Sequence, residues 1–129
     1  MPRELPPALR AFLHGEVEGA DFHHADHVRV AFEMLRRHGF LDAAQAYARG
    51  LKDIATRAGN PAAYHETITI AFLALIAERS AAHDFASFET FAAANPDLLD
   101  TSVLTRWYAP ERLASAAARR TFILPERRP

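Results

Sequence analysis

The segment ITIAFLALIA, residues 68–77, is apolar around nearly the whole circumference of a helix and interrupted by Thr69 alone. A helix with apolar side chains on every side must be buried, either at the centre of a domain or at an interface. The segment is too short to cross a bilayer. Asn60 and Pro61 precede it and suit a helix N-cap and first turn, which predicts a helix from about residue 61 to 82. Other helices must therefore pack around this one.

Helix start and stop signals on both sides of this segment predict those partners. Asp21 is a suitable N-cap for a helix ending near Gly39, and Asp42 for a helix ending near Gly59. Shorter helices are expected over residues 7–18, 85–94, 97–107 and 110–120, followed by an extended tail over 121–125. No segment alternates at the period of a strand. We therefore predict an all-α fold, a compact helical bundle with short C-terminal helices and an extended C-terminal tail.

Composition narrows the class of protein. A chain of 129 residues forms one helical domain, 1–129. Its 15 basic and 16 acidic residues give a formal net charge of −1, which argues against nucleic acid and anionic membranes as partners. The absence of cysteine excludes disulfides, thiolate catalysis and cysteine-ligated metals. The N-terminus lacks the apolar stretch of a signal peptide, so we expect a cytoplasmic protein without membrane spans.

Two of the predicted helices carry histidine on their apolar faces. His24 lies near the middle of the face formed by Val28 and Ala31, with His27 towards one edge and His23 at the boundary. His65 falls within the apolar group of the helix that contains residues 68–77. Burying an imidazole is unfavourable unless a partner satisfies it, so these positions point to a site.

The short connections predict that the three histidines meet. Consecutive helices joined by a few residues run antiparallel, so the helices that carry His24 and His65 should be parallel. Counted from their predicted caps, His24, His27 and His65 then lie within about one turn of axial height. His38 lies at the opposite end and is excluded.

Three convergent imidazoles are typical of a divalent metal with one open position. Without cysteine the candidates are zinc, iron, manganese, nickel and copper, and ligand type does not choose among them. Asp26 and Glu66 are candidates for a fourth ligand, a catalytic base or an orienting group. A His23 and His27 pair is the rival ligand assignment, and Tyr64 and Thr69 are further pocket candidates.

Simpler interpretations of the same residues remain open. The histidines also suit a metal-free polar network, and Asp26 and Glu66 suit acids that complement helix dipoles. Tyr64 is also consistent with a core residue whose hydroxyl finds a partner. Arg79 lies on an apolar stripe, where we expect it to extend its charge towards solvent rather than contact an anion.

Two sequence blocks carry a resemblance. FHHADHVRVA (22–31) and YHETIT (64–69) are similar to blocks of a group of small uncharacterised bacterial helical proteins, marked by the patterns FxHxxH and YHxT. The residues LTRWY (104–108) and FILP (122–125) extend that similarity. A looser likeness is to metal-binding bundles of the DinB and YfiT type, which implies a metal held by three histidines on bundle helices. This chain is shorter and takes two of its three candidate ligands from one helix.

Three functions follow from these observations. The first is a metal-dependent hydrolase or lyase acting on a small polar substrate, with His24, His27 and His65 as metal ligands. The second is a non-catalytic metal-binding, ligand-binding or sensor module that uses the same histidines. The third is a metal-free protein that forms a homodimer through the apolar helix and Phe85, Phe88 and Phe91.

Overall fold

The computed structural model describes residues 5–126, and every regular secondary-structure element in that range is a helix or a helical turn. The bounds of the elements are α1 Pro7–Leu13, η1 Gly19–Asp21, α2 His24–Arg37, α3 Phe40–Arg57, η2 Pro61–Ala63, α4 Glu66–Ala81, α5 Phe88–Ala94, η3 Pro96–Leu99, η4 Val103–Arg106, α6 Pro110–Leu113 and α7 Ala116–Arg120. Elements labelled η are short 3₁₀ turns. The predicted all-α bundle with short C-terminal helices is confirmed.

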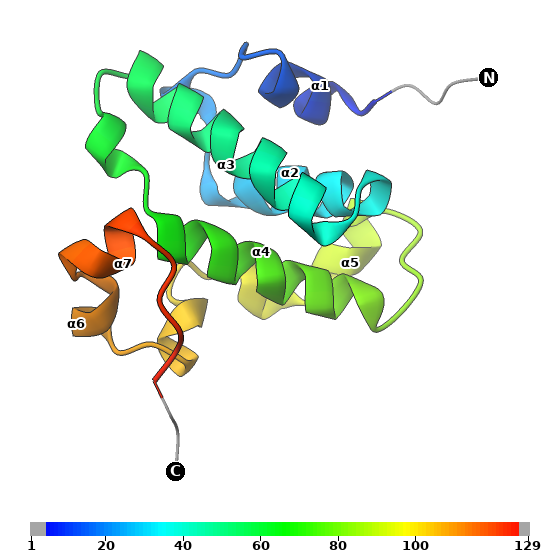
Figure 1. Cartoon of the computed structure of the whole chain (residues 1–129). Helices are drawn as coiled ribbons and strands as arrows, with labels where there is room; N and C mark the ends of the chain where they lie inside the picture. Colours follow the sequence, from blue (N-terminus) through cyan, green and yellow to red (C-terminus); the bar gives the residue numbers. More distant parts are fainter. Residues whose placement is uncertain (1–4, 127–129) are drawn as a thin grey trace.

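Helix α4, which contains the segment 68–77, has neighbours on several sides (Figure 1). It packs against α2 and α3 on one side and against α7 and η4 on another. This arrangement accounts for its apolar circumference, because helices or turns cover most of its surface. Leu73 and Ile76 are fully buried, whereas Ile68 remains 40% exposed.

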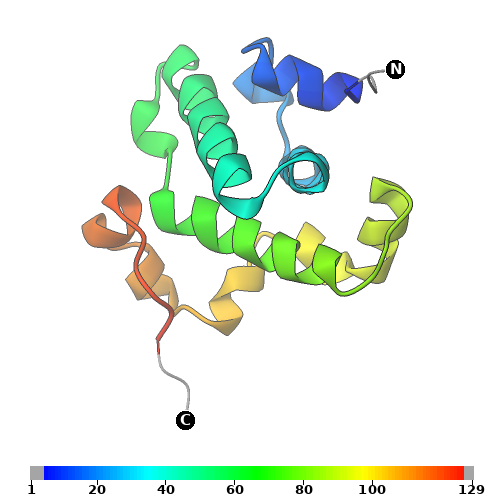
Figure 2. The ribbon, with the colours of Figure 1, turned by 45° about the vertical axis from the view of Figure 1, so that its right-hand side comes forward.

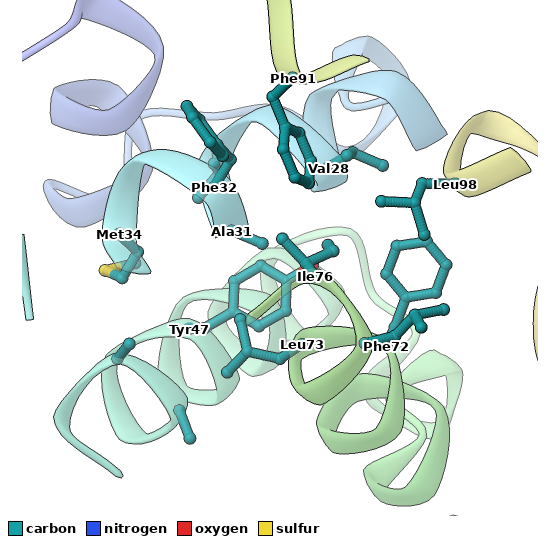
Figure 3. Close-up of a cluster of buried hydrophobic side chains, with 14 of the residues drawn as sticks. Val28, Ala31, Phe32, Met34, Tyr47, Phe72, Leu73, Ile76, Phe91 and Leu98 are labelled. Atoms are coloured by element: carbon teal, nitrogen blue, oxygen red, sulfur yellow. The ribbon is translucent and has the colours of Figure 1, made fainter. Parts of the chain in front are cut away.

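The core lies where α2, α3, α4 and α5 meet, and Figure 3 shows its labelled side chains. Phe32 of α2 stacks on Phe91 of α5 with ring centroids 4.6 Å apart. Phe85 and Phe88 complete this aromatic group, with centroid distances of 5.2 Å from Phe85 to Phe91 and 6.0 Å from Phe88 to Phe32. Of the phenylalanines proposed for a dimer interface, Phe88 and Phe91 are buried within the chain and Phe85 is half-buried, and the homodimer stays a prediction.

The relative direction of α2 and α4 differs from the sequence prediction. Figure 2 views α2 nearly end-on while α4 lies across the picture, so the two helices cross steeply and are not parallel. Short connections make consecutive helices neighbours, but the crossing angle is set by how their side chains interlock. The argument that placed three histidines at one axial height therefore does not hold.

Two helix starts also differ from the predicted ones. Asp21 ends a 3₁₀ turn, and the N-cap of α2 is His23. Pro61 opens a separate turn, after which Tyr64 is extended and α4 begins with His65 as its N-cap. Asn60 does precede a helical turn, whereas Asp21 ends one, and in both places the short turn ends before the main helix starts.

The last described segment, residues 121–126, runs extended, as predicted. The Thr67 hydroxyl of α4 donates to the Thr121 carbonyl at 2.8 Å and accepts the Ile123 N–H at 3.1 Å. The Tyr108 hydroxyl donates to the Ile123 carbonyl at 2.9 Å. Among the described residues no helix has the length and apolar character needed to span a bilayer.

Candidate ligand-binding site

The N-terminal end of α2 is held by its own first turn. The backbone N–H of His23 donates to Asp26 Oδ2 at 2.9 Å. A carboxylate at this position also complements the positive end of the helix dipole. The His23 side chain is exposed. Asp26 therefore acts as a helix-capping residue in this structure, and His23 takes no part in a buried site.

His24 and His27 lie side by side one turn apart. Their ring centroids are 6.4 Å apart and the rings are inclined by 27°. His24 Nε2 lies 2.8 Å from the Leu98 carbonyl, to which it donates as the Nε2–H tautomer, and its ring meets Phe72 edge-on at 5.1 Å. The ring of His27 lies 4.3 Å from that of Phe22. The structure thus brings two of the three predicted ligands together.

His27 is uncharged at neutral pH. Burial, together with the electrostatic influence of His24, lowers its pKa to about 4, while Asp26 opposes the shift. A neutral imidazole offers one donor and one acceptor nitrogen. Within residues 5–126 no protein group forms a hydrogen bond with either ring nitrogen of His27. These nitrogens are available to a bound molecule.

His65 has a different role from the one expected. Its Nδ1 accepts the backbone N–H of Ile68 at 3.1 Å, which caps α4. Its Nε2 lies 2.6 Å from the carbonyl of Leu113 and donates to it. Both ring nitrogens are therefore engaged, and coordination of an ion would require His65 to release the helix cap or the C-terminal segment.

Glu66 and Tyr64 form a separate polar pair. The Tyr64 hydroxyl donates to Glu66 Oε1 at 2.7 Å. Burial raises the pKa of Tyr64, and the hydrogen bond with Glu66 raises it further. The Lys52 ammonium lies 5.1 Å from the centre of the Tyr64 ring. Glu66 does not line the cavity beside His24 and His27.

In the described part of the chain, no three or more side chains of the His, Cys, Asp and Glu types are grouped so as to hold a metal ion. His24 and His27 are near each other, and neither Asp26 nor Glu66 joins them in the cavity lining. The expected three-histidine centre stays a prediction, and the structure supplies a pair.

Beside this pair is a cavity of about 400 Å³. It lies between α2, α3 and α4 on one side and the segment 101–113 on the other. Its lining residues are His24, His27, Tyr47, Leu51, Ile68, Thr69, Phe72, Thr101, Leu104, Thr105 and Leu113. This lining contains no Asp, Glu, Lys or Arg. The size falls within the range of small-molecule sites.

Sequence reasoning found part of this lining. His24, His27 and Thr69 were predicted site residues and lie in the cavity wall. Thr101, Leu104 and Leu113 were missed, because no local pattern shows that a segment some 80 residues away covers α2. The hydrogen bond between His65 and the carbonyl of Leu113 holds the segment 101–113 against α4.

Comparison of the chain with protein-family models, with curated proteins and with solved structures finds no match in any of the three.

Proposed function

We propose that the protein is a non-catalytic binding module that takes a small, neutral and largely apolar molecule into the cavity beside His24 and His27. The observation that carries this proposal is the absence of any formally charged side chain from a lining of this size. A charged ligand buried there loses its hydration without gaining a countercharge, at a cost of several kcal/mol. A neutral ligand avoids that penalty.

His27 supplies the polar contact that orients such a ligand. Its ring is held against Phe22, and its nitrogens have no protein partner among the described residues. Apolar pockets with a few fixed polar groups are the usual form of small-molecule sites. A ligand hydroxyl or carbonyl beside His27 forms a hydrogen bond with one nitrogen of the imidazole, while Leu51, Phe72 and Leu104 contact the apolar part.

The experiment compares 2-naphthol with naphthalene by isothermal titration calorimetry. We expect 2-naphthol to bind the wild-type protein, and His27→Phe to weaken it about tenfold, the usual effect of one lost hydrogen bond. Naphthalene affinity should change little, since phenylalanine keeps the apolar contact. His23→Phe is the matched control, because this exposed histidine lies outside the cavity.

Charged analogues provide the second arm of this experiment. Naphthalene-2-carboxylate and 2-naphthylmethylammonium should bind at least about a hundredfold more weakly than 2-naphthol, given the cost of burying an unpaired charge. Equal affinity for a charged and a neutral probe, or binding of none of them, contradicts the proposal.

Metal binding, with hydrolase or lyase chemistry, is the second candidate. It is favoured by the neutral His27 beside His24, because a neutral imidazole is the form that binds divalent metals. Elemental analysis of untagged protein supplemented with zinc, iron, manganese, nickel and copper is the test. A stoichiometric ion that is lost in His27→Phe supports this candidate, and an ion retained in that variant excludes the pair as its ligands.

A further inference from the structure

A second cavity, of about 300 Å³, has His27 in its wall as well. Its lining residues are Gly19, Phe22, His27, Leu51, Ile54, Ala55, Ala58, Asn60, Ala63 and Tyr64. Like the first cavity, it has no formally charged side chain in its wall. We call the first one the inner cavity and this one the outer cavity.

His27 and Leu51 line both cavities, and they come from different helices, α2 and α3. The Phe22 ring, 4.3 Å from the His27 ring, belongs to the outer cavity alone. The His24 ring, 6.4 Å from the His27 ring, belongs to the inner cavity alone. The imidazole of His27 therefore stands where the two cavities meet.

We propose that one elongated ligand occupies both cavities, with a carboxamide or ester group beside His27 and an apolar arm on each side. This inference rests on the proposed function and names the chemical class of its ligand. Two largely apolar spaces that share one hydrogen-bonding side chain, His27, match a molecule with a polar centre and two apolar ends. A ligand with one polar end pairs with His27 but fills only one of the two cavities.

A carboxamide matches His27 best. The neutral imidazole has one N–H donor and one nitrogen acceptor, and a secondary amide can meet either of them, through its carbonyl as acceptor or its N–H as donor, one at a time. An ester satisfies only the donor nitrogen of the ring. We therefore expect a secondary amide to bind more tightly than the ester of equal length.

The test uses hexanamide, N-butylhexanamide and butyl hexanoate in isothermal titration calorimetry with the full chain. Hexanamide fills one cavity, and the added butyl arm should enter the other. Each buried methylene contributes about fourfold, so N-butylhexanamide should bind at least about tenfold more tightly than hexanamide even if its arm is only partly buried. Butyl hexanoate should bind more weakly than N-butylhexanamide.

Filling the outer cavity should remove the tighter binding of N-butylhexanamide relative to hexanamide. Ala55→Trp places a large side chain from α3 into the outer cavity, and Ala63→Trp does so from an exposed turn that tolerates replacement. We expect both variants to lose the tenfold preference for N-butylhexanamide over hexanamide. Thr56→Trp is the matched control, because it follows Ala55 directly but is exposed and lines neither cavity.

The outcomes separate the two proposals. If the preference persists in both Ala55→Trp and Ala63→Trp, or is absent from the wild type, the two-armed ligand is wrong. If 2-naphthol binds through His27 and no amide binds, the proposed binding site in the inner cavity is supported and the two-armed amide ligand is wrong. If neither 2-naphthol nor any amide binds, the proposed function itself falls.

Discussion

His27 links the chemistry of the cavity to the stability of the protein. Its folded-state pKa of about 4 lies below the ordinary value of 6.5, chiefly because burial penalises the charged ring. The unfolded chain therefore binds a proton between these values that the folded chain does not. The stability that the neutral His27 contributes is fully present above pH 6.5 and is lost progressively as the pH falls towards 4.

We expect the free energy of unfolding to fall by up to about 3 kcal/mol between pH 7 and pH 4 through this residue alone. Urea unfolding followed by circular dichroism at half-unit pH steps measures the fall. In His27→Phe, which has no group to titrate at this position, the free energy of unfolding should fall by about 3 kcal/mol less than in the wild type over the same pH range. Parallel pH profiles for the wild type and this variant would show that folding does not lower the pKa of His27.

Thr67 offers a second prediction for a single side chain. Its hydroxyl is fully buried and joins α4 to the tail through both Thr121 and Ile123. Thr67→Val keeps the shape and leaves two backbone groups without their partner, which should cost about 1–3 kcal/mol of unfolding free energy. Chemical denaturation measures this cost, and Thr56→Val, at an exposed site, should stay within about 0.5 kcal/mol of the wild type.

These residues also show what the sequence could predict. The helical period placed His24 and His27 on a buried face, and the structure puts both in a cavity wall. The role of His65 was unpredictable, because imidazole is not among the preferred N-cap side chains. Its capping role follows from the extended Tyr64, which separates the turn at Pro61 from α4.

For whole elements, the apolar pattern identified the central helix, but local signals misplaced several boundaries. Residues 97–107 were predicted as one helix and form two 3₁₀ turns. The Asp100 carboxylate accepts the Ser102 N–H at 2.9 Å and interrupts the helix there. This break positions Thr101 and Leu104 in the cavity wall. Such side-chain to backbone bonds compete with helix formation and are weakly encoded in the apolar period.

Arg79 of α4 links this helix to η3. We expected it to reach solvent, but its guanidinium binds Asp97 of η3 through two hydrogen bonds, of 3.0 and 2.8 Å. It also donates to Asn95 Oδ1 at 3.0 Å. The contact fixes the C-terminal half of α4 against the segment that follows α5.

A double-mutant cycle of Arg79→Met and Asp97→Asn should give a coupling energy of about 1 kcal/mol, since both side chains are partly exposed and solvent screens the pair. Thermal or urea unfolding of the four proteins measures it. A coupling energy of zero would mean that the Arg79–Asp97 ion pair adds no stability.

Across the whole molecule, α1 and the cavities are connected through a series of aromatic contacts. Phe12 of α1 is buried, and its ring lies 5.7 Å from Phe22 and 5.9 Å from Tyr47. Phe22 contacts His27, and Tyr47 lines the inner cavity. Gly50 of α3 makes room for Phe12, because a Cβ at this position would overlap its ring.

Gly50→Ala should therefore disturb both stability and binding. The added methyl group forces Phe12 to shift, which should cost about 1–3 kcal/mol as overpacking does in other cores. Because Phe12 supports Phe22 and Tyr47, the same variant should bind 2-naphthol more weakly than the wild type. Gly19→Ala is the control for stability, since its new Cβ would be in ordinary contact with Ala58 at 3.5 Å. A Gly50→Ala protein that loses stability but keeps full 2-naphthol affinity would show that α1 supports the fold without shaping the cavities.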